Sequence, residues 1–171
     1  WQMKLLIVNQ HSQNHGDEAA CLSLLRAIRN RWQCSGICVQ YNMPENANGC
    51  FAPDTTPVNG RSVRGQGSAV KLYMRFPNWF TRLILLLFPK WRVQYSAIKN
   101  SDVVMNSPGG ANYGDYAYLW RLYEAVRLHK TTVFYSSSIP DINQPENFSR
   151  IFREILKKCD FVSLRDAASY R

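Results

Sequence analysis

The stretch "MKLLIVNQHSQNHGDEAACLSLLRAI", Met3 to Ile28, combines an apolar run, a polar loop and an amphipathic pattern in direct succession. The run Met3–Val8 is typical of a strand buried on both faces in a parallel sheet. From Glu18 to Trp32, apolar residues recur at steps of three and four, which predicts a helix with one buried face. A second strand pattern, Gly36–Tyr41, follows at once, so the chain opens with a βαβ unit, whose crossover is nearly always right-handed.

The same alternation continues along the chain. Strands are predicted over Val103–Met105, Thr131–Ser136 and Phe161–Leu164, and helices over Phe76–Trp91, Tyr116–His129 and Phe148–Lys158. The segment Asn42–Gly67 is rich in Pro, Gly and Asn and predicts a long loop. This order predicts an α/β fold: a Rossmann-like open parallel sheet with helices on both faces. With 46% hydrophobic residues, the chain 1–171 is expected to form a single domain.

The formal net charge of +9 predicts an anionic partner. Most of the excess lies between Thr55 and Ser101, where eight basic residues occur without an acid. Within residues 61–99, basic and aromatic residues flank the apolar run Leu83–Phe88, as in helices that dock on an anionic membrane surface. A helix packed in the core is the alternative. No DNA or RNA recognition motif accompanies the charge, so nucleic acid is not an expected partner.

Cysteine spacing and the absence of long apolar segments bear on localisation. The five cysteines are irregularly spaced and lack the paired spacing of zinc or redox sites, which predicts reduced thiols and a cytoplasmic chain. Leu83–Phe88, the longest apolar run, is far shorter than the roughly 20 residues that span a bilayer. We therefore expect a cytoplasmic protein, peripheral on the inner face of the membrane through residues 61–99. No dense ligand cluster predicts a metal.

In open α/β sheets, ligands bind beyond the carboxyl ends of the strands, so the loops there hold the candidate site. After the first strand, Asp17 and Glu18 fall in the first helical turn, where helix capping is an alternative role for both. Their charge disfavours a phosphate and favours a hydroxyl-bearing ligand such as a sugar, from which Asp17 would accept a proton. His11 and His15 are further candidate bases, with simple solvation as the alternative.

Two later loops suit anions better. Gly109-Gly110 permits a tight turn whose backbone N–H groups face a ligand, although ordinary turn formation would also explain the pair. Arg165 directly follows the last predicted strand, and its guanidinium suits bidentate binding of a carboxylate or phosphate. The alternative for Arg165 is a surface ion pair with Asp166.

Taken together, "NHGDEAACLSLLRAI" from Asn14, "DVVMNSPGGANYGD" from Asp102 and "FVSLRDAASYR" from Phe161 resemble the polysaccharide pyruvyl transferase family. The resemblance implies a fold similar to one half of a GT-B glycosyltransferase, with 1–171 as the N-terminal domain and the second domain absent from this chain. It implies a transferase of exopolysaccharide biosynthesis that moves a pyruvyl group from phosphoenolpyruvate, its donor substrate, to a sugar of a surface or lipid-linked glycan. No further cofactor is implied.

The resemblance also implies residue roles. It places Asn14, Gly16 and Asp17 on the acceptor side, Gly109 and Gly110 at the border of the cleft, and Arg165 on the donor. The predicted catalytic residues are Asp17, His15 and Arg165, with His15 taken as a candidate base of the first loop. The predicted substrate-binding residues are Asn14, Gly16, Gly109, Gly110, Asn112 and Arg165. Two alternatives stay open: a GT-B-like glycosyltransferase that uses a nucleotide-sugar, and a non-catalytic binding domain. The isolated half is expected to bind its acceptor without turnover.

Overall fold

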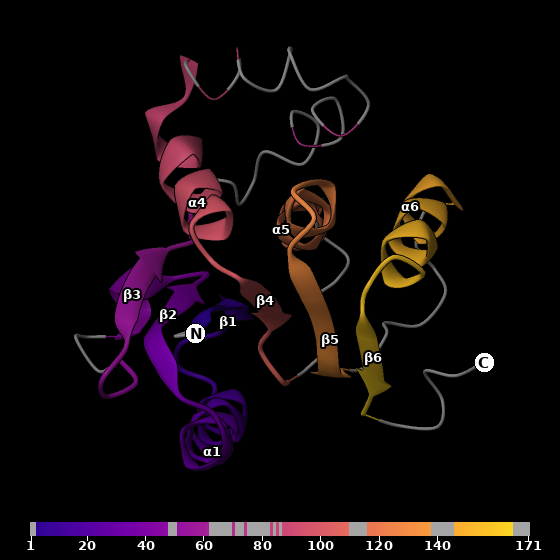
Figure 1. Cartoon of the computed structure of the whole chain (residues 1–171). Helices are drawn as coiled ribbons and strands as arrows, with labels where there is room; N and C mark the ends of the chain where they lie inside the picture. The colour runs from indigo at the N-terminus through magenta and orange to yellow at the C-terminus, as the bar shows by residue number, and fades with distance from the viewer. Residues whose placement is uncertain are drawn as a thin grey trace.

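The computed structural model in Figure 1 describes residues 3–47, 51–61, 70, 74, 83, 85, 87–109, 116–137 and 146–165. Its strands are β1 (Met3–Gln10), β2 (Cys34–Tyr41), β3 (Thr56–Asn59), β4 (Val103–Asn106), β5 (Thr131–Ser137) and β6 (Phe161–Leu164). The α-helices are α1 (His15–Arg31), α4 (Pro89–Lys99), α5 (Tyr116–Arg127) and α6 (Glu146–Leu156), and a 3-10 helix, η1, spans Pro44–Ala47.

The strands form one parallel sheet in the order β3-β2-β1-β4-β5-β6. The chain moves outward from β1 to β3, returns to place β4 beside β1, and then moves outward in the other direction. The strand order therefore reverses between β1 and β4, which is where open α/β sheets bind their ligands. This arrangement confirms the predicted Rossmann-like parallel sheet.

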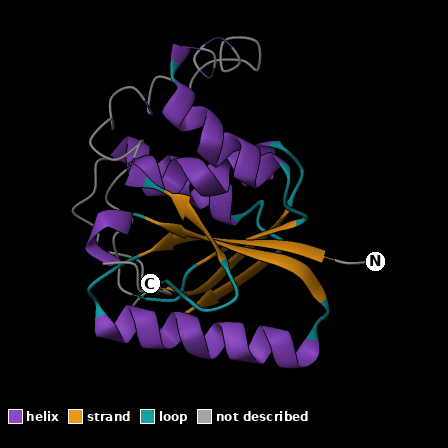
Figure 2. Cartoon of the chain, turned by 90° about the vertical axis from the view of Figure 1, so that its left-hand side faces the viewer, coloured by secondary structure: helices purple, strands orange, loops and turns teal. Residues whose placement is uncertain are grey.

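Helices cover both faces of this sheet, as predicted. Helix α1 lies on one face, and α4, α5 and α6 lie together on the other (Figure 2). The reason is the right-handedness of the crossovers. The connection from β1 to β2 runs along the sheet in the opposite direction to the connections that follow β3, so its helix must cover the opposite face.

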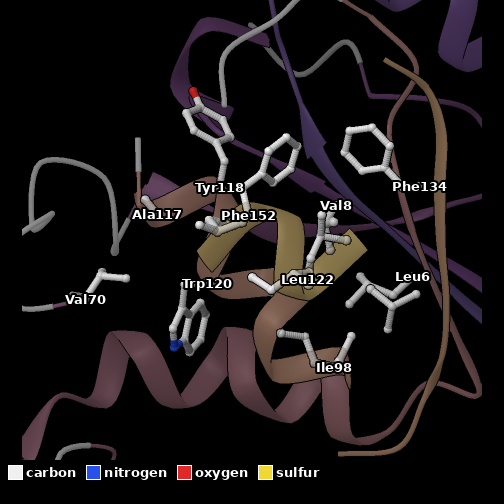
Figure 3. Packing of buried hydrophobic residues seen from close by; sticks show 14 of the residues in the cluster. Leu6, Val8, Val70, Ile98, Ala117, Tyr118, Trp120, Leu122, Phe134 and Phe152 are labelled. Atoms are coloured by element: carbon white, nitrogen blue, oxygen red, sulfur yellow. The ribbon is translucent and has the colours of Figure 1, made fainter. Parts of the chain in front are cut away.

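Strand β1 supplies side chains to both layers of the core. Leu5 and Ile7 pack in the cluster that includes the buried residues of α1. Leu6 and Val8 point the other way, into the larger cluster that contains Trp120 of α5 (Figure 3). Successive residues of a strand face opposite sides of the sheet, so a strand covered on both sides has apolar residues at consecutive positions, as in Leu5–Val8. The apolar run in β1 is therefore explained by burial on both faces of the sheet.

The prediction of an uninterrupted loop over Asn42–Gly67 was wrong in its described part. This segment contains η1 and β3, and β3 pairs in parallel with β2. Strand β3 is short and lies at the edge of the sheet, where Pro57 is tolerated because one side of the strand needs no hydrogen-bond donor. It therefore lacks the continuous apolar run of an interior strand.

The helix predicted over Phe76–Trp91 lies largely outside the described residues. Within the described part, Pro89 begins a helix instead of ending one, and α4 continues to Lys99. Proline fits the first helical turn because the N–H that it lacks has no partner there. A proline can stand at the start of a helix or just after its end, so the sequence alone did not show whether Pro89 begins a helix or follows one.

Candidate functional site at the carboxyl edge of the sheet

Every strand ends at, or directly before, a polar residue. In chain order from β1 to β6 these residues are Gln10, Asn42, Asn59, Asn106, Ser137 and Arg165. Because all strands are parallel, the six residues lie along the same edge of the sheet. Four of them are buried, namely Gln10, Asn42, Asn106 and Ser137. A polar, partly enclosed edge thus lies where the fold places ligands.

Helix α1 begins at His15, three residues earlier than predicted, because Asn14 caps it. The Asn14 side-chain oxygen accepts a hydrogen bond from the Asp17 N–H at 3.4 Å, and Asn14 Nδ2 donates to Asp17 Oδ2 at 2.9 Å. Glu18 Oε1 in turn accepts the N–H of Gln13 at 2.9 Å. Both acids therefore take part in the capping arrangement that the sequence left open as an alternative role.

The loop after β1 meets the loop after β4 at the point where the strand order reverses. Asp17 is only 6% exposed. Its carboxylate lies against Gly109, since a β-carbon built on Gly109 would lie 2.5 Å from Asp17 Oδ1. Gly109 also has a φ of +152°, which side chains of L-residues rarely adopt. Close approach and backbone geometry together require glycine here. Gly110 and Asn112 lie outside the described residues.

The two histidines of the first loop have different surroundings. The His15 side chain is 99% exposed, and its Nδ1 lies 3.5 Å from a Glu18 carboxylate oxygen. The His11 ring instead lies 5.8 Å from the ring of Tyr118 at the start of α5. Gly16 is exposed, and a β-carbon there would make only an ordinary contact with Asn14. Of the two histidines, it is therefore His11 that lies between the loop and α5.

Arg165 lies at the same edge, but on the outermost strand. Its backbone N–H donates to the Ser137 carbonyl at 3.3 Å, and its side chain is exposed. Strand β6 is two positions from β4 in the sheet, which corresponds to roughly 10 Å. The structure thus brings Asn14, Asp17 and Gly109 together and places Arg165 further along the same edge.

A hydrogen-bonded group beside Gly109 was missed by sequence reasoning. Asn106 Nδ2 donates to Ser137 Oγ at 2.5 Å, and Asn106 Oδ1 accepts the Tyr135 N–H at 2.8 Å. The Ser107 hydroxyl donates to Gln10 Oε1, which links β4 to β1. The available signal was an Asn-Ser pair directly after an apolar strand. These bonds fix the ends of the three neighbouring strands β1, β4 and β5.

Of the five described non-glycine residues with a positive φ, three lie at the same edge. Asn9, Gln13 and Ser136 have φ values of 68°, 64° and 47°. All three lie at or just beyond the carboxyl ends of β1 and β5. Left-handed conformations at non-glycine residues cost free energy and are frequent at binding and catalytic sites. This independent feature supports the same location.

The buried, hydrogen-bonded position of Arg121 in α5 is the second feature that the sequence did not reveal. It is 1% exposed, and its guanidinium donates to Asn9 Oδ1 at 2.5 Å, Asn42 Oδ1 at 2.7 Å and the Gly60 carbonyl at 2.6 Å. A fourth bond, of 3.1 Å, reaches Gln94 of α4. Arg121 thus joins the ends of β1, β2 and β3. An arginine inside an amphipathic helix pattern looks solvated in sequence, which is why this role was missed.

Cys21 lies in the buried face of α1, the helix that begins at the carboxyl edge of the sheet. Burial raises the pKa of the Cys21 thiol to about 11, and a hydrogen bond with Ser107 lowers it in part. The thiol is therefore protonated at neutral pH and unsuited to nucleophilic attack. Among the described residues, no three metal-binding side chains come together, and no helix is long and apolar enough to cross a membrane.

The fold is a Rossmann-like α/β domain, and its candidate ligand site lies at the carboxyl edge, where β1 and β4 meet. Among known families, the model for polysaccharide pyruvyl transferase matches residues 14–171. The chain belongs to this family. The match begins at the cap of α1 and includes Gly109 and Arg165. No curated protein matches the chain.

Proposed function

We propose that this domain is the acceptor-binding half of a GT-B-like enzyme that transfers a pyruvyl group from phosphoenolpyruvate to a sugar of a surface or lipid-linked glycan. The observation that carries the proposal is the contact of the Asp17 carboxylate with Gly109 at the reversal of strand order, inside a chain of the pyruvyl transferase family. The capped start of α1 already carries two carboxylates, which favours a hydroxyl-bearing ligand over a nucleoside diphosphate.

The proposed reaction forms a ketal. Two sugar hydroxyl oxygens bond to C2 of phosphoenolpyruvate, the bond between C2 and the phosphate oxygen breaks, and inorganic phosphate leaves. One hydroxyl proton is balanced by the proton that C3 gains as it becomes a methyl group, and the other by the proton that phosphate carries. Asp17 would accept a hydroxyl proton, with His15 as the second proposed proton carrier. Asn14 and Gly16 would line the acceptor side, beside Gly109. Gly110 and Asn112 stay sequence-based predictions for substrate binding.

Arg165 is proposed to bind the anionic groups of the donor. In the full-length protein, Arg165→Ala is expected to lower kcat/KM for phosphoenolpyruvate by about 10- to 100-fold, because a charge-assisted hydrogen bond contributes about 1.5–3 kcal/mol. The measurement is phosphate release with phosphoenolpyruvate and a panel of sugar acceptors. Arg153→Ala, at an exposed arginine of α6, is the matched control and should leave the rate unchanged.

Unchanged kinetics in Arg165→Ala would remove that residue from the donor site. Release of nucleoside diphosphate from a nucleotide-sugar, without phosphate release from phosphoenolpyruvate, would instead assign the protein to the glycosyltransferases. If the full-length protein acts on neither donor but binds glycans, the domain is a binding module.

We also propose that the start of α4 docks on an anionic membrane surface, where a lipid-linked acceptor would be found. Leu87 and Val93 are 66% and 55% exposed, and Leu83 and Phe88 are exposed as well, whereas Leu85 is buried in the core. Because α4 leads into β4, it runs antiparallel to the strands, and its first residues lie toward the carboxyl edge. Apolar side chains within a basic segment suit the interface between headgroups and acyl chains.

This docking is expected to depend on both apolar contact and charge. The protein should co-sediment with phosphatidylglycerol vesicles at low salt and less at high salt. The double variant Leu87→Gln, Phe88→Gln should reduce binding about tenfold or more, since each exposed side chain would lose its insertion into the interface. Trp32→Gln, at an exposed apolar residue at the end of α1, is the control. Equal binding of the double variant and wild type would refute the proposed face.

A further inference from the structure

A cavity of about 840 Å³ lies between α5 and α6, away from the candidate site. Its lining includes Thr131, the first residue of β5, and Asp160, the residue before β6. The α5–α6 cavity is therefore at the amino edge of the sheet, opposite the carboxyl edge. Figure 1 shows the two helices side by side on the same face. The volume is in the range of small-molecule sites.

The floor of the α5–α6 cavity is apolar. Tyr123 and Val126 face it from α5, and Ile151 faces it from α6. All three are only half-buried. Nearer their starts, the two helices are closed against each other by the contact of Tyr116 with Phe148, whose ring centroids lie 5.1 Å apart. The apolar surface left open therefore belongs to the later turns of both helices.

The rim of the cavity is cationic. Lys130 follows α5, Arg150 lies on α6, and Lys158 follows α6. Among the described residues, no ion pair involves any of these three. Hydrogen bonding and charge from Lys157 lower the pKa of Glu154, and the charges of Lys158 and Arg150 lower it further, which reflects the positive field of this region. The rim is set to attract an anion.

The carboxylates around the cavity already have partners. Glu154 Oε1 accepts from Lys157 Nζ at 3.0 Å, and Asp160 Oδ2 accepts the Thr132 N–H at 2.8 Å. The buried Glu124 carboxylate accepts two hydrogen bonds from Arg127, at 2.7 and 3.1 Å. The ion pair with Glu124 balances Arg127, and the ion pair with Lys157 balances Glu154. The Thr132 N–H is neutral and leaves the charge of Asp160 in place, so the rim carries three cations against one carboxylate.

Helix dipoles explain part of this charge but not all of it. Lysines near the ends of α5 and α6 complement the partial negative charge of a helix C-terminus. Arg150 lies in the first half of α6, where that effect is absent. Nor does a dipole explain an apolar floor between the cations.

We propose that the α5–α6 cavity binds a phosphate monoester that carries an apolar chain. Three cations suit a dianionic phosphate better than a single carboxylate, and the phosphate would lie among Lys130, Arg150 and Lys158. The chain would cover Tyr123, Val126 and Ile151, which removes apolar surface from water. This site lies at the edge of the sheet opposite the transferase site and does not rest on the proposed reaction.

The test uses monomeric octyl phosphate, below its micelle concentration, and isothermal titration calorimetry. Octyl phosphate is expected to bind at least tenfold more tightly than inorganic phosphate or octanol, because only octyl phosphate uses both rim and floor. The double variant Arg150→Gln, Lys158→Gln should weaken octyl phosphate binding about tenfold or more. Both residues are exposed, so the fold should be preserved.

Arg153→Gln removes one exposed positive charge from the same helix outside the cavity lining, and it should bind like wild type. Equal affinities for octyl phosphate and inorganic phosphate would overturn the proposal in favour of simple charge attraction. Unchanged binding in the double variant would also overturn it, as would binding to phosphatidylglycerol vesicles without binding to monomeric octyl phosphate. Because the readout is binding, a failed transferase assay would not affect the result.

Discussion

Arg121→Met is expected to lower the free energy of unfolding by about 3–5 kcal/mol, the largest effect of any single substitution proposed for this chain. Arg121 is buried, and its four hydrogen-bond partners come from three strand ends and α4. Methionine fills similar space but donates no hydrogen bond. Buried acceptors on Asn9, Asn42 and Gly60 would lose the bonds that Arg121 donates, and each such loss is costly. Urea unfolding followed by circular dichroism measures the change.

Two further variants isolate the cause. Arg121→Lys keeps the positive charge but lacks the planar fork that reaches several acceptors at once, so its loss should lie between wild type and Arg121→Met. Arg153→Met, at an exposed position on α6, should change stability by no more than about 0.5 kcal/mol. Arg121→Met and Arg153→Met of equal stability would show that Arg121 does not hold the strand ends together.

Gly109→Ala is expected to destabilise the protein by about 1–3 kcal/mol and to remove the close contact between residue 109 and the Asp17 carboxylate in the candidate site. The added β-carbon would lie 2.5 Å from Asp17 Oδ1, and alanine would be strained at a φ of +152°. Asp17 would have to move away from the loop after β4. The proposed transferase activity should fall together with stability, which unfolding and phosphate-release measurements test in parallel.

The contribution of Asp17 can be separated with a double-mutant cycle. If the contact is the main cost, Gly109→Ala should cost less in an Asp17→Ala background, with a coupling of about 0.5–3 kcal/mol. Gly36→Ala is the matched control because a β-carbon at Gly36 meets nothing within 4 Å. The same cost in both backgrounds would assign the whole effect to the backbone conformation of Gly109.

The local patterns of the sequence predicted most of the fold. Strand β1 could be predicted because burial on both faces produces a continuous apolar run. Helix α1 could be predicted because burial on one face produces apolar residues at steps of three and four. Strand β3 could not be predicted, because a short edge strand with Pro57 carries little apolar signal. The bounds of α1 depended on Asn14, whose capping contacts begin the helix at His15.

The sequence predicted which loops form the candidate site, but it did not predict the contacts between them. His15 was predicted as a catalytic residue, and the cap at Asn14 turns its side chain outward into solvent, so its role stays a prediction. His11, weighed as the other base, lies beside Tyr118. Arg121 was not singled out in the sequence, although it is among the most buried large side chains.

By itself, the sequence determined the alternation of strands and helices, the polar loops after the strands, and the family to which the chain belongs. Periodicity, helix caps and glycine turns act between near neighbours, so they can be read from the chain directly. Only the tertiary structure decided that Asp17 lies against Gly109 and that Arg121 bonds to Asn9, 112 positions away. Strand order and crossover handedness set such contacts, and they belong to the sheet as a whole.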